Sequence, residues 1–129
     1  MHDIESEADV KKLVDSFYRK VIADPVIGFI FTEVVTITWE EHMPVMYAFW
    51  STTLLGSSVY TGNPMLKHLE LDKKIKLRKE HFDRWLLLWD ETVTANFEGK
   101  IAAEAIQRAR NIAYLMQHKI NQQRAIEHS

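Results

Sequence analysis

The sequence contains no cysteine, only four glycines and only three prolines among its 129 residues. Without thiols the chain can form no disulfide, no cysteine-ligated metal or iron–sulfur site, and no thiolate nucleophile. The scarcity of glycine and proline argues against a β-sandwich or barrel, because those folds need many tight turns. These absences favour a fold with few connections, and they fit a reducing compartment.

A strong charge of one sign and a long apolar run are also missing. Sixteen Lys and Arg stand against 18 Asp and Glu, so the net charge of −2 gives no basic field that would attract nucleic acid. The longest weakly polar stretch, Pro44 to Gly56, is well short of the roughly 20 residues that span a membrane. No basic start leads into an apolar run, so we expect no secretory signal and a cytoplasmic location.

What the sequence does contain is helical periodicity. In four stretches apolar residues recur every three or four positions, which predicts an all-α fold without strands. The first stretch begins at Ser6, with Asp9 three residues on as in a capping box, and it ends before Pro25. The second begins at Thr38, with Glu41 as its capping partner, and ends near residue 56.

The other two predicted helices run from about 79 to 97 and from about 100 to 120, with Gly99 between them. The final residues, Asn121 to Ser129, are polar, and we expect them to be frayed. Long amphipathic helices pack as antiparallel pairs, so residues 1–129 are expected to form one domain with a core from about 7 to 120. The stretch from 56 to 79 interrupts this pattern, and a plain four-helix bundle would not need it.

His68 lies in that interrupting stretch, after the turn-like Gly62-Asn63-Pro64 and before Leu69. A histidine flanked by apolar residues is often a structural residue that only forms hydrogen bonds. The alternative is an axial ligand of haem iron, which requires a single imidazole on a short, pliable segment. The residues alone leave both interpretations open.

Three further polar side chains lie on the apolar faces of predicted helices: Tyr18, His42 and Trp85. The simple interpretation is a core histidine, a tyrosine with its hydroxyl in water, and a tryptophan that fills the core. In the functional interpretation all three face an apolar pocket opposite His68, where their hydrogen-bonding groups would meet a bound ligand. A buried hydroxyl without a partner costs about 1–3 kcal/mol, so a dry pocket would require one.

Other site chemistries lack their motifs. The sequence contains no His-Glu-x-x-His, no Glu-x-x-His, no Gly-x-Ser-x-Gly and no glycine-rich phosphate loop. The basic run from Lys73 to Lys79 is most simply a solvated connection. Its functional interpretation is a partner for anionic groups, cofactor carboxylates included, at the rim of the pocket.

Five segments together carry a resemblance to a known family. They are Phe17-Tyr18, Asp24 to Phe31, His42 to Trp50, Tyr60 to Leu69, and His81 to Leu86. In this order, over roughly residues 7–120, they resemble the group III truncated haemoglobins of bacteria. The resemblance implies a two-over-two helical sandwich, a shortened globin around haem b. The chain departs from the family pattern between Asp72 and Lys79, where a lysine-rich stretch replaces a proline-rich one.

The resemblance also implies roles for individual residues. His68 matches the proximal iron ligand. Tyr18 and Trp85 match the distal residues that donate hydrogen bonds to a bound ligand. His42 matches the distal histidine typical of group III, which either gates entry or coordinates the iron in the ligand-free state, and the spacing does not decide between the two. The other haem-pocket residues implied by the resemblance are Phe31, Met46, Phe49, Tyr60, Lys67, Leu69 and Phe82.

The function that the resemblance implies is the binding of dioxygen, nitric oxide and other small ligands at haem iron. Two distal donors would slow ligand release, which favours redox chemistry on oxygen, nitric oxide or peroxide over bulk transport. A nitric oxide dioxygenase-like or peroxidase-like activity, with an unidentified reductase as electron donor, is therefore one expectation. The alternatives are a reversible oxygen store or ligand sensor, and a helical interaction protein without a cofactor.

Overall fold

The computed structural model describes residues 1–35, 37–56, 71–72 and 75–127. The described residues contain no strand, which confirms the predicted all-α class. They form four α-helices and one π-helical segment: α1 (Glu7–Ala23), η1 (Ile30–Val34), α2 (Trp39–Leu55), α4 (Lys79–Asn96) and α5 (Lys100–Glu127).

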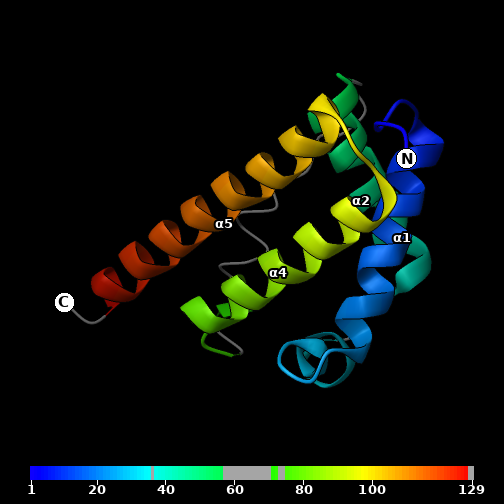
Figure 1. The fold of residues 1–129 in the computed structure, drawn as a ribbon. Coiled ribbons are helices and arrows are strands. Elements are labelled where there is room, and N and C mark those ends of the chain that lie inside the picture. The colour runs from blue at the N-terminus through cyan, green and yellow to red at the C-terminus, as the bar shows by residue number, and fades with distance from the viewer. Residues whose placement is uncertain (36, 57–70, 73–74, 128–129) are drawn as a thin grey trace.

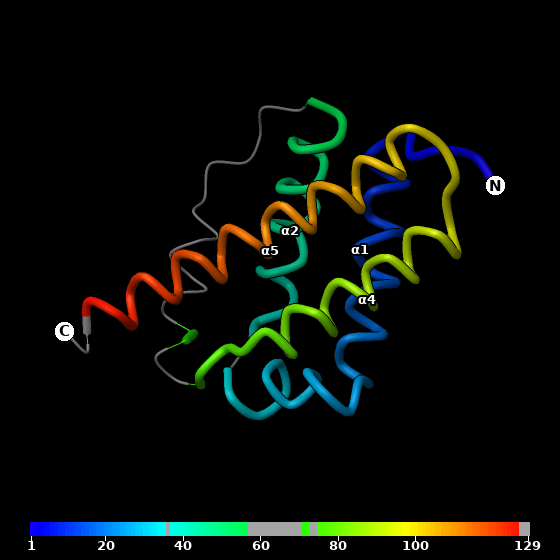
Figure 2. The backbone as a smooth tube through the Cα atoms, turned by 60° about the vertical axis from the view of Figure 1, so that its left-hand side comes forward, coloured from blue at the N-terminus to red at the C-terminus, as the bar shows by residue number. Residues whose placement is uncertain are grey.

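The helices form two antiparallel pairs that cross each other. α1 packs against α2, and α4 packs against α5 (Figure 1). In the rotated view, α4 crosses α1 and α5 crosses α2, and both of these pairs are in contact (Figure 2). This is the two-over-two sandwich that the family resemblance implied.

The centre of the fold is Trp89 on α4, which is completely buried. Its ring stacks on Trp50 of α2 with centroids 4.3 Å apart, and it meets Phe17 of α1 edge-on at 5.0 Å. Its indole N–H donates to the carbonyl oxygen of Ala105 on α5 at 3.0 Å. One side chain of α4 therefore contacts α1, α2 and α5 and satisfies its own polar group, as a buried tryptophan requires.

The predicted start of α1 is confirmed. The Ser6 hydroxyl accepts the backbone N–H of Asp9 at 3.3 Å, and the Asp9 carboxylate accepts the N–H of Glu5 at 2.9 Å. The first contact satisfies a donor that the first helical turn leaves free, and the second holds the segment just before the N-cap, at Glu5 rather than at Ser6 as in a strict capping box. The helix ends at Ala23, two residues before Pro25, as predicted.

Asp24 joins the end of α1 to α4. One oxygen of its nearly buried carboxylate accepts the N–H groups of Val26 at 2.9 Å and Ile27 at 3.1 Å. The other accepts Nε of Arg84 at 2.8 Å and Nη2 at 2.7 Å. The hydrogen bond from Arg84 is the main reason why the pKa of Asp24 is lowered, against the opposing effect of burial. A charged, fully bonded carboxylate thus sets where the chain turns from α1 towards η1.

The start of α2 corrects one prediction. Thr38 is the N-cap residue, but its side chain makes no capping hydrogen bond, so the predicted capping box is wrong. The N–H of Glu41, which a capping hydroxyl would serve, donates to the carbonyl oxygen of Thr38 instead at 3.0 Å. The other end agrees with the sequence: Gly56 adopts a left-handed φ of 75°, which terminates the helix.

The end of α5 corrects a second prediction. The helix does not fray after Ile120 but continues to Glu127. Ile120 is buried, and Arg124 pairs with Asp72 and with the backbone of Leu77. A polar tail indicates solvent exposure only when no tertiary partner is present, and here the partner lies about fifty positions away in the sequence.

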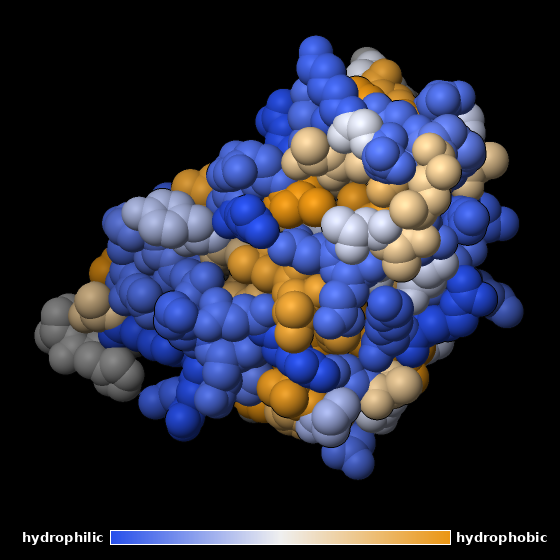
Figure 3. Space-filling view, in the orientation of Figure 1, coloured by the Kyte–Doolittle hydropathy of each residue, from blue (hydrophilic) through white to orange (hydrophobic). Residues whose placement is uncertain are grey.

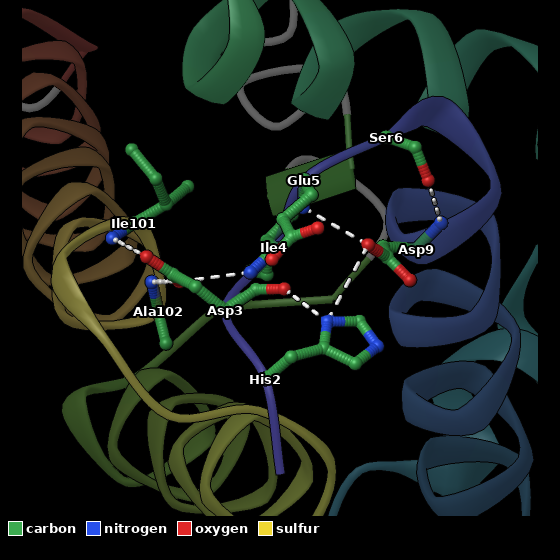
Figure 4. A network of polar contacts seen from close by, with 8 residues as sticks. All are labelled: His2, Asp3, Ile4, Glu5, Ser6, Asp9, Ile101 and Ala102. Carbon is green, nitrogen blue, oxygen red and sulfur yellow. Dashed lines mark hydrogen bonds and ion pairs between the residues drawn. The ribbon is translucent and has the colours of Figure 1, made fainter.

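The N-terminal segment also joins the core, which the sequence did not predict. Ile4 is buried, and the Asp3 carboxylate accepts the N–H groups of Ile101 at 2.9 Å and Ala102 at 2.8 Å (Figure 4). Asp3 is therefore an N-cap for α5, supplied from the other end of the chain. Gly99 permits the contact, because its φ is 142° and a β-carbon there would lie 2.6 Å from the Asp3 side chain.

No helix of the described residues has both the length and the apolar character needed to cross a membrane. The space-filling view shows apolar side chains between α4 and α5, with polar ones around them (Figure 3). Among the exposed large apolar residues of these two helices are Leu87 and Tyr114.

Replacing Asp3 tests the cap of α5. We expect Asp3→Ala to lower the free energy of unfolding by about 0.5–2 kcal/mol, because it leaves helix N–H groups without acceptors. Asp3→Asn keeps an acceptor oxygen and should lose clearly less. Urea denaturation followed by circular dichroism measures both values, and equal losses in the two variants would contradict the capping role.

Acid should weaken the contact between Asp24 and Arg84. The lowered pKa of Asp24 means that its contribution is complete above the ordinary aspartate value of about 3.9 and is lost as the pH falls through the lower folded-state value. Asp24→Asn should lower the free energy of unfolding at neutral pH by about 1–3 kcal/mol and flatten the acid decline. Denaturation curves from neutral pH to about pH 3 test this, with the surface variant Asp83→Asn as control. An unchanged acid decline in Asp24→Asn would refute the assignment.

Candidate functional site

A cavity of about 570 Å³ lies between the two helix pairs. Side chains from α1, η1, α2, α4 and α5 line it, and most of them are apolar or aromatic. Pockets for small molecules and cofactors usually measure about 300–1,000 Å³ and have such walls. The volume and the lining therefore suit a largely apolar cofactor.

The apolar face of α2 lines this cavity. Met46 and Phe49 belong to the predicted apolar stripe of α2, yet they are only half-buried and line the cavity wall. The buried residues of the same helix, Trp50, Ser51 and Leu54, lie nearer its C-terminal end. A stripe this apolar is normally covered by a neighbouring helix, so its partial exposure gives the cavity an apolar wall.

Tyr18 and His42 meet at the cavity wall. His42 Nε2 lies 3.1 Å from the Tyr18 hydroxyl oxygen, within hydrogen-bond distance. The Tyr18 ring is also packed edge-on against Phe31 at 6.0 Å and Trp39 at 5.6 Å, which holds its orientation. Burial raises the pKa of Tyr18 well above its ordinary value, so the phenol stays protonated.

Trp85 lies one helical turn before Trp89 and lines the same cavity. Its ring packs edge-on against Phe17 with centroids 5.8 Å apart and lies nearly parallel to Trp89 at 6.4 Å. Among the described residues its indole N–H has no hydrogen-bond partner, whereas the N–H of Trp89 is bonded to Ala105. Trp85 therefore brings an available donor to the wall of the cavity.

His81 is a cavity residue that the sequence interpretation missed. Its Nδ1 accepts the backbone N–H of Arg78 at 2.9 Å, so in the neutral ring the proton lies on Nε2. His81 precedes Trp85 by four positions, and residues at this spacing share one face of a helix. That spacing was the signal by which the sequence could have found it.

The structure brings seven of the predicted pocket residues together. Tyr18, Phe31, His42, Met46, Phe49, Phe82 and Trp85 all line the cavity. Tyr60, Lys67, His68 and Leu69 lie outside the described residues. Of the basic run, Lys76, Arg78 and Lys79 are exposed and are not part of the cavity wall, while Leu71 and Leu77 beside them are.

The chemistry of the wall suits haem better than a bare metal ion. Nowhere in the described stretches do three or more His, Asp or Glu side chains gather as they would around an ion. The wall instead combines large apolar surfaces with a few hydrogen-bonding groups, those of Tyr18, His42, His81 and Trp85 among them. A porphyrin requires apolar contact over both faces, and a ligand beside it requires a few well-placed donors.

Comparison with known proteins agrees with this geometry. The family model described as bacterial-like globin matches residues 2–121. A group 3 truncated hemoglobin of Campylobacter jejuni is 31% identical over 118 residues, which cover 89% of this chain and 91% of that protein. The crystal structure of a group III truncated hemoglobin from Campylobacter jejuni superposes with a TM-score of 0.80 at 31% identity, covering 93% of this chain and 95% of the other. The chain therefore belongs to the bacterial-like globin family, in its group of group III truncated haemoglobins.

Proposed function

We propose that the cavity holds haem b with His68 as the proximal iron ligand. We further propose that the protein with haem bound carries out redox chemistry on small ligands. Globins bind diatomic ligands at haem iron, and this chain shares that activity as a member of the family. One observation supports the finer proposal: Tyr18 and Trp85, whose side chains carry a hydroxyl and an indole N–H, line a mainly apolar cavity.

The contact between Tyr18 and His42 decides how the phenol is used. If His42 carries its proton on Nε2, that N–H donates to the Tyr18 oxygen and the hydroxyl hydrogen is free to point into the cavity. With the proton on Nδ1 instead, the hydroxyl would donate to His42 and would be lost to a ligand. We propose the first arrangement, because it leaves the Tyr18 hydroxyl for a ligand, and we propose that His42 gates entry, as the family resemblance implies.

Two donors in a dry cavity should hold a polar diatomic ligand firmly. Each hydrogen bond contributes about 0.5–1.5 kcal/mol, so together they slow ligand release by roughly ten- to hundred-fold. Slow release is unfavourable for transport and favourable for chemistry on the retained ligand. Dioxygen, nitric oxide and peroxide are the ligands we propose, with an unidentified reductase as the source of electrons.

We also propose roles for residues on the proximal face of the haem and a location for the whole chain. Residues 57–70, which include His68, lie outside the described residues, so its role rests on the sequence motif and on family membership. Tyr60, Lys67 and Leu69 are proposed to contact the haem edge on the same grounds. We further propose that residues 1–129 form one globin domain that works in the cytoplasm.

The role of His68 is tested by its removal. We expect His68→Ala to retain haem poorly and to lack the ferrous spectrum of the wild-type protein, and we expect added imidazole to restore that spectrum. His118→Ala, which changes an exposed histidine on α5, is the control and should behave as wild type. A wild-type ferrous spectrum in His68→Ala without imidazole would exclude His68 as the ligand.

The two donors are tested by ligand release. Stopped-flow oxygen dissociation should be faster by roughly three- to tenfold in Tyr18→Phe and in Trp85→Phe, because each variant loses one hydrogen bond. Tyr47→Phe is the matched control, since the Tyr47 hydroxyl donates to Asp15 away from this cavity. Unchanged rates in both cavity variants would overturn the assignment. Rapid exchange in the wild type, without turnover of nitric oxide or peroxide, would favour a reversible store.

A further inference from the structure

The last turns of α5 lie beyond the part of the chain that the family model matches. That match ends at residue 121, whereas the helix continues to Glu127. In Figures 1 and 2 these turns extend past the start of α4, at the far end of the molecule from the N-terminus. A short helical extension without contacts would fray in water. Its persistence therefore requires tertiary contacts.

Arg124 supplies those contacts through its guanidinium group. Nε donates to Oδ2 of Asp72 at 3.2 Å, and Nη2 donates to Oδ1 of the same carboxylate. Nη2 also donates to the backbone carbonyl oxygen of Leu77 at 2.8 Å. This two-pronged pairing of a guanidinium with a carboxylate is a strong, directional form of charge-assisted hydrogen bond.

The same carboxylate also binds the backbone of Leu77. Oδ1 of Asp72 accepts the Leu77 N–H at 2.8 Å. Both backbone polar groups of Leu77 are therefore bonded within this one cluster of Asp72, Leu77 and Arg124. The side chains of Arg124 and Asp72 are 27% and 11% exposed, so water screens the pair less than it screens a surface ion pair.

The residues held by this cluster form part of the cavity wall. Leu77 is buried and lines the cavity, as does Leu71, the neighbour of Asp72. Ile112 and Met116 of α5, the helix that carries Arg124, line the same cavity. Arg124 thus joins two parts of one wall, one from the segment before α4 and one from α5.

We propose that Arg124 is a positioning residue for the cofactor: through Asp72 and Leu77 it holds the wall of the cavity closed and so slows the loss of haem. The inference rests on the proposed function, because it takes the cavity to be the haem site. Arg124 itself does not line the cavity, so its effect passes through Leu77, which it binds, and through Asp72, the neighbour of Leu71.

A second ion pair of α5 provides a matched control. Arg110 donates one hydrogen bond to Asp90 of α4 at 2.9 Å, so a guanidinium and a carboxylate again join α5 to a preceding segment, without the two-pronged geometry. Neither Arg110 nor Asp90 lines the cavity, and Arg110 is 55% exposed. If the ion pairs of α5 affect only the stability of the fold, the rate of haem loss should rise with the loss in free energy of unfolding by the same relation, whichever pair is removed.

The test measures the rate at which haem passes from the purified haem protein to an excess of apomyoglobin. Arg124→Gln and Asp72→Asn should each lose haem roughly tenfold faster, and the double variant no faster than the single ones, because both remove one contact. Arg124→Lys keeps the charge without the two-pronged geometry and should be intermediate. Arg110→Gln should lose haem at the wild-type rate.

The free energy of unfolding of each haem-free variant shows whether Arg124 acts by positioning the cavity wall or only by stabilising the fold. Faster haem loss in Arg124→Gln than in a variant of equal stability supports the positioning role, and wild-type haem loss in Arg124→Gln overturns it. If Arg124→Gln does not fold, as judged by circular dichroism, Arg124→Lys decides in the same way. A wild-type protein that shows no Soret band when produced with sufficient haem would instead refute the proposed function.

Discussion

Trp89 is the contact on which the rest of this structure depends. It stacks on Trp50, meets Phe17 edge-on and donates its N–H to Ala105, so the four α-helices converge on one ring. Phe17 of α1 and Trp89 of α4 take part in this contact. Tyr18 follows Phe17 by one position and Trp85 precedes Trp89 by one turn, so both lie at the edge of the core. Tight packing at Trp89 and an open cavity beside it are two consequences of the same arrangement.

A fold that keeps a cavity between its helix pairs loses contacts that a solid core would make. Charged side chains bonded to backbone groups compensate for this at its periphery. Asp24 joins α1 to Arg84 on α4, Asp3 caps the first turn of α5, and Arg124 binds the segment before α4. In each case nearly every polar atom has a partner, which is the condition under which a buried charge stabilises rather than destabilises.

Local signals in the sequence predicted much of the fold and part of the site. Ser6, Pro25 and Gly56 mark helix ends because capping and backbone geometry depend on neighbouring residues. The prediction failed at Thr38, where the backbone carbonyl replaced the hydroxyl, and after Ile120, where the partner is distant in sequence. His81 was missed because its spacing of four positions from Trp85 was the one signal that linked it to the site, and a histidine at the start of a helix otherwise resembles any solvated polar residue.

The sequence by itself determined the all-α class, the helix periodicity and the supply of phenol, imidazole and indole groups, because each of these follows from residue type and local spacing. Only the tertiary structure decided that Tyr18 meets His42, that the N–H of Trp85 lacks a partner among the described residues while that of Trp89 does not, and that Arg124 binds Asp72. These are distances between residues far apart in the chain, and such distances depend on how helices pack, which no local pattern of residues encodes.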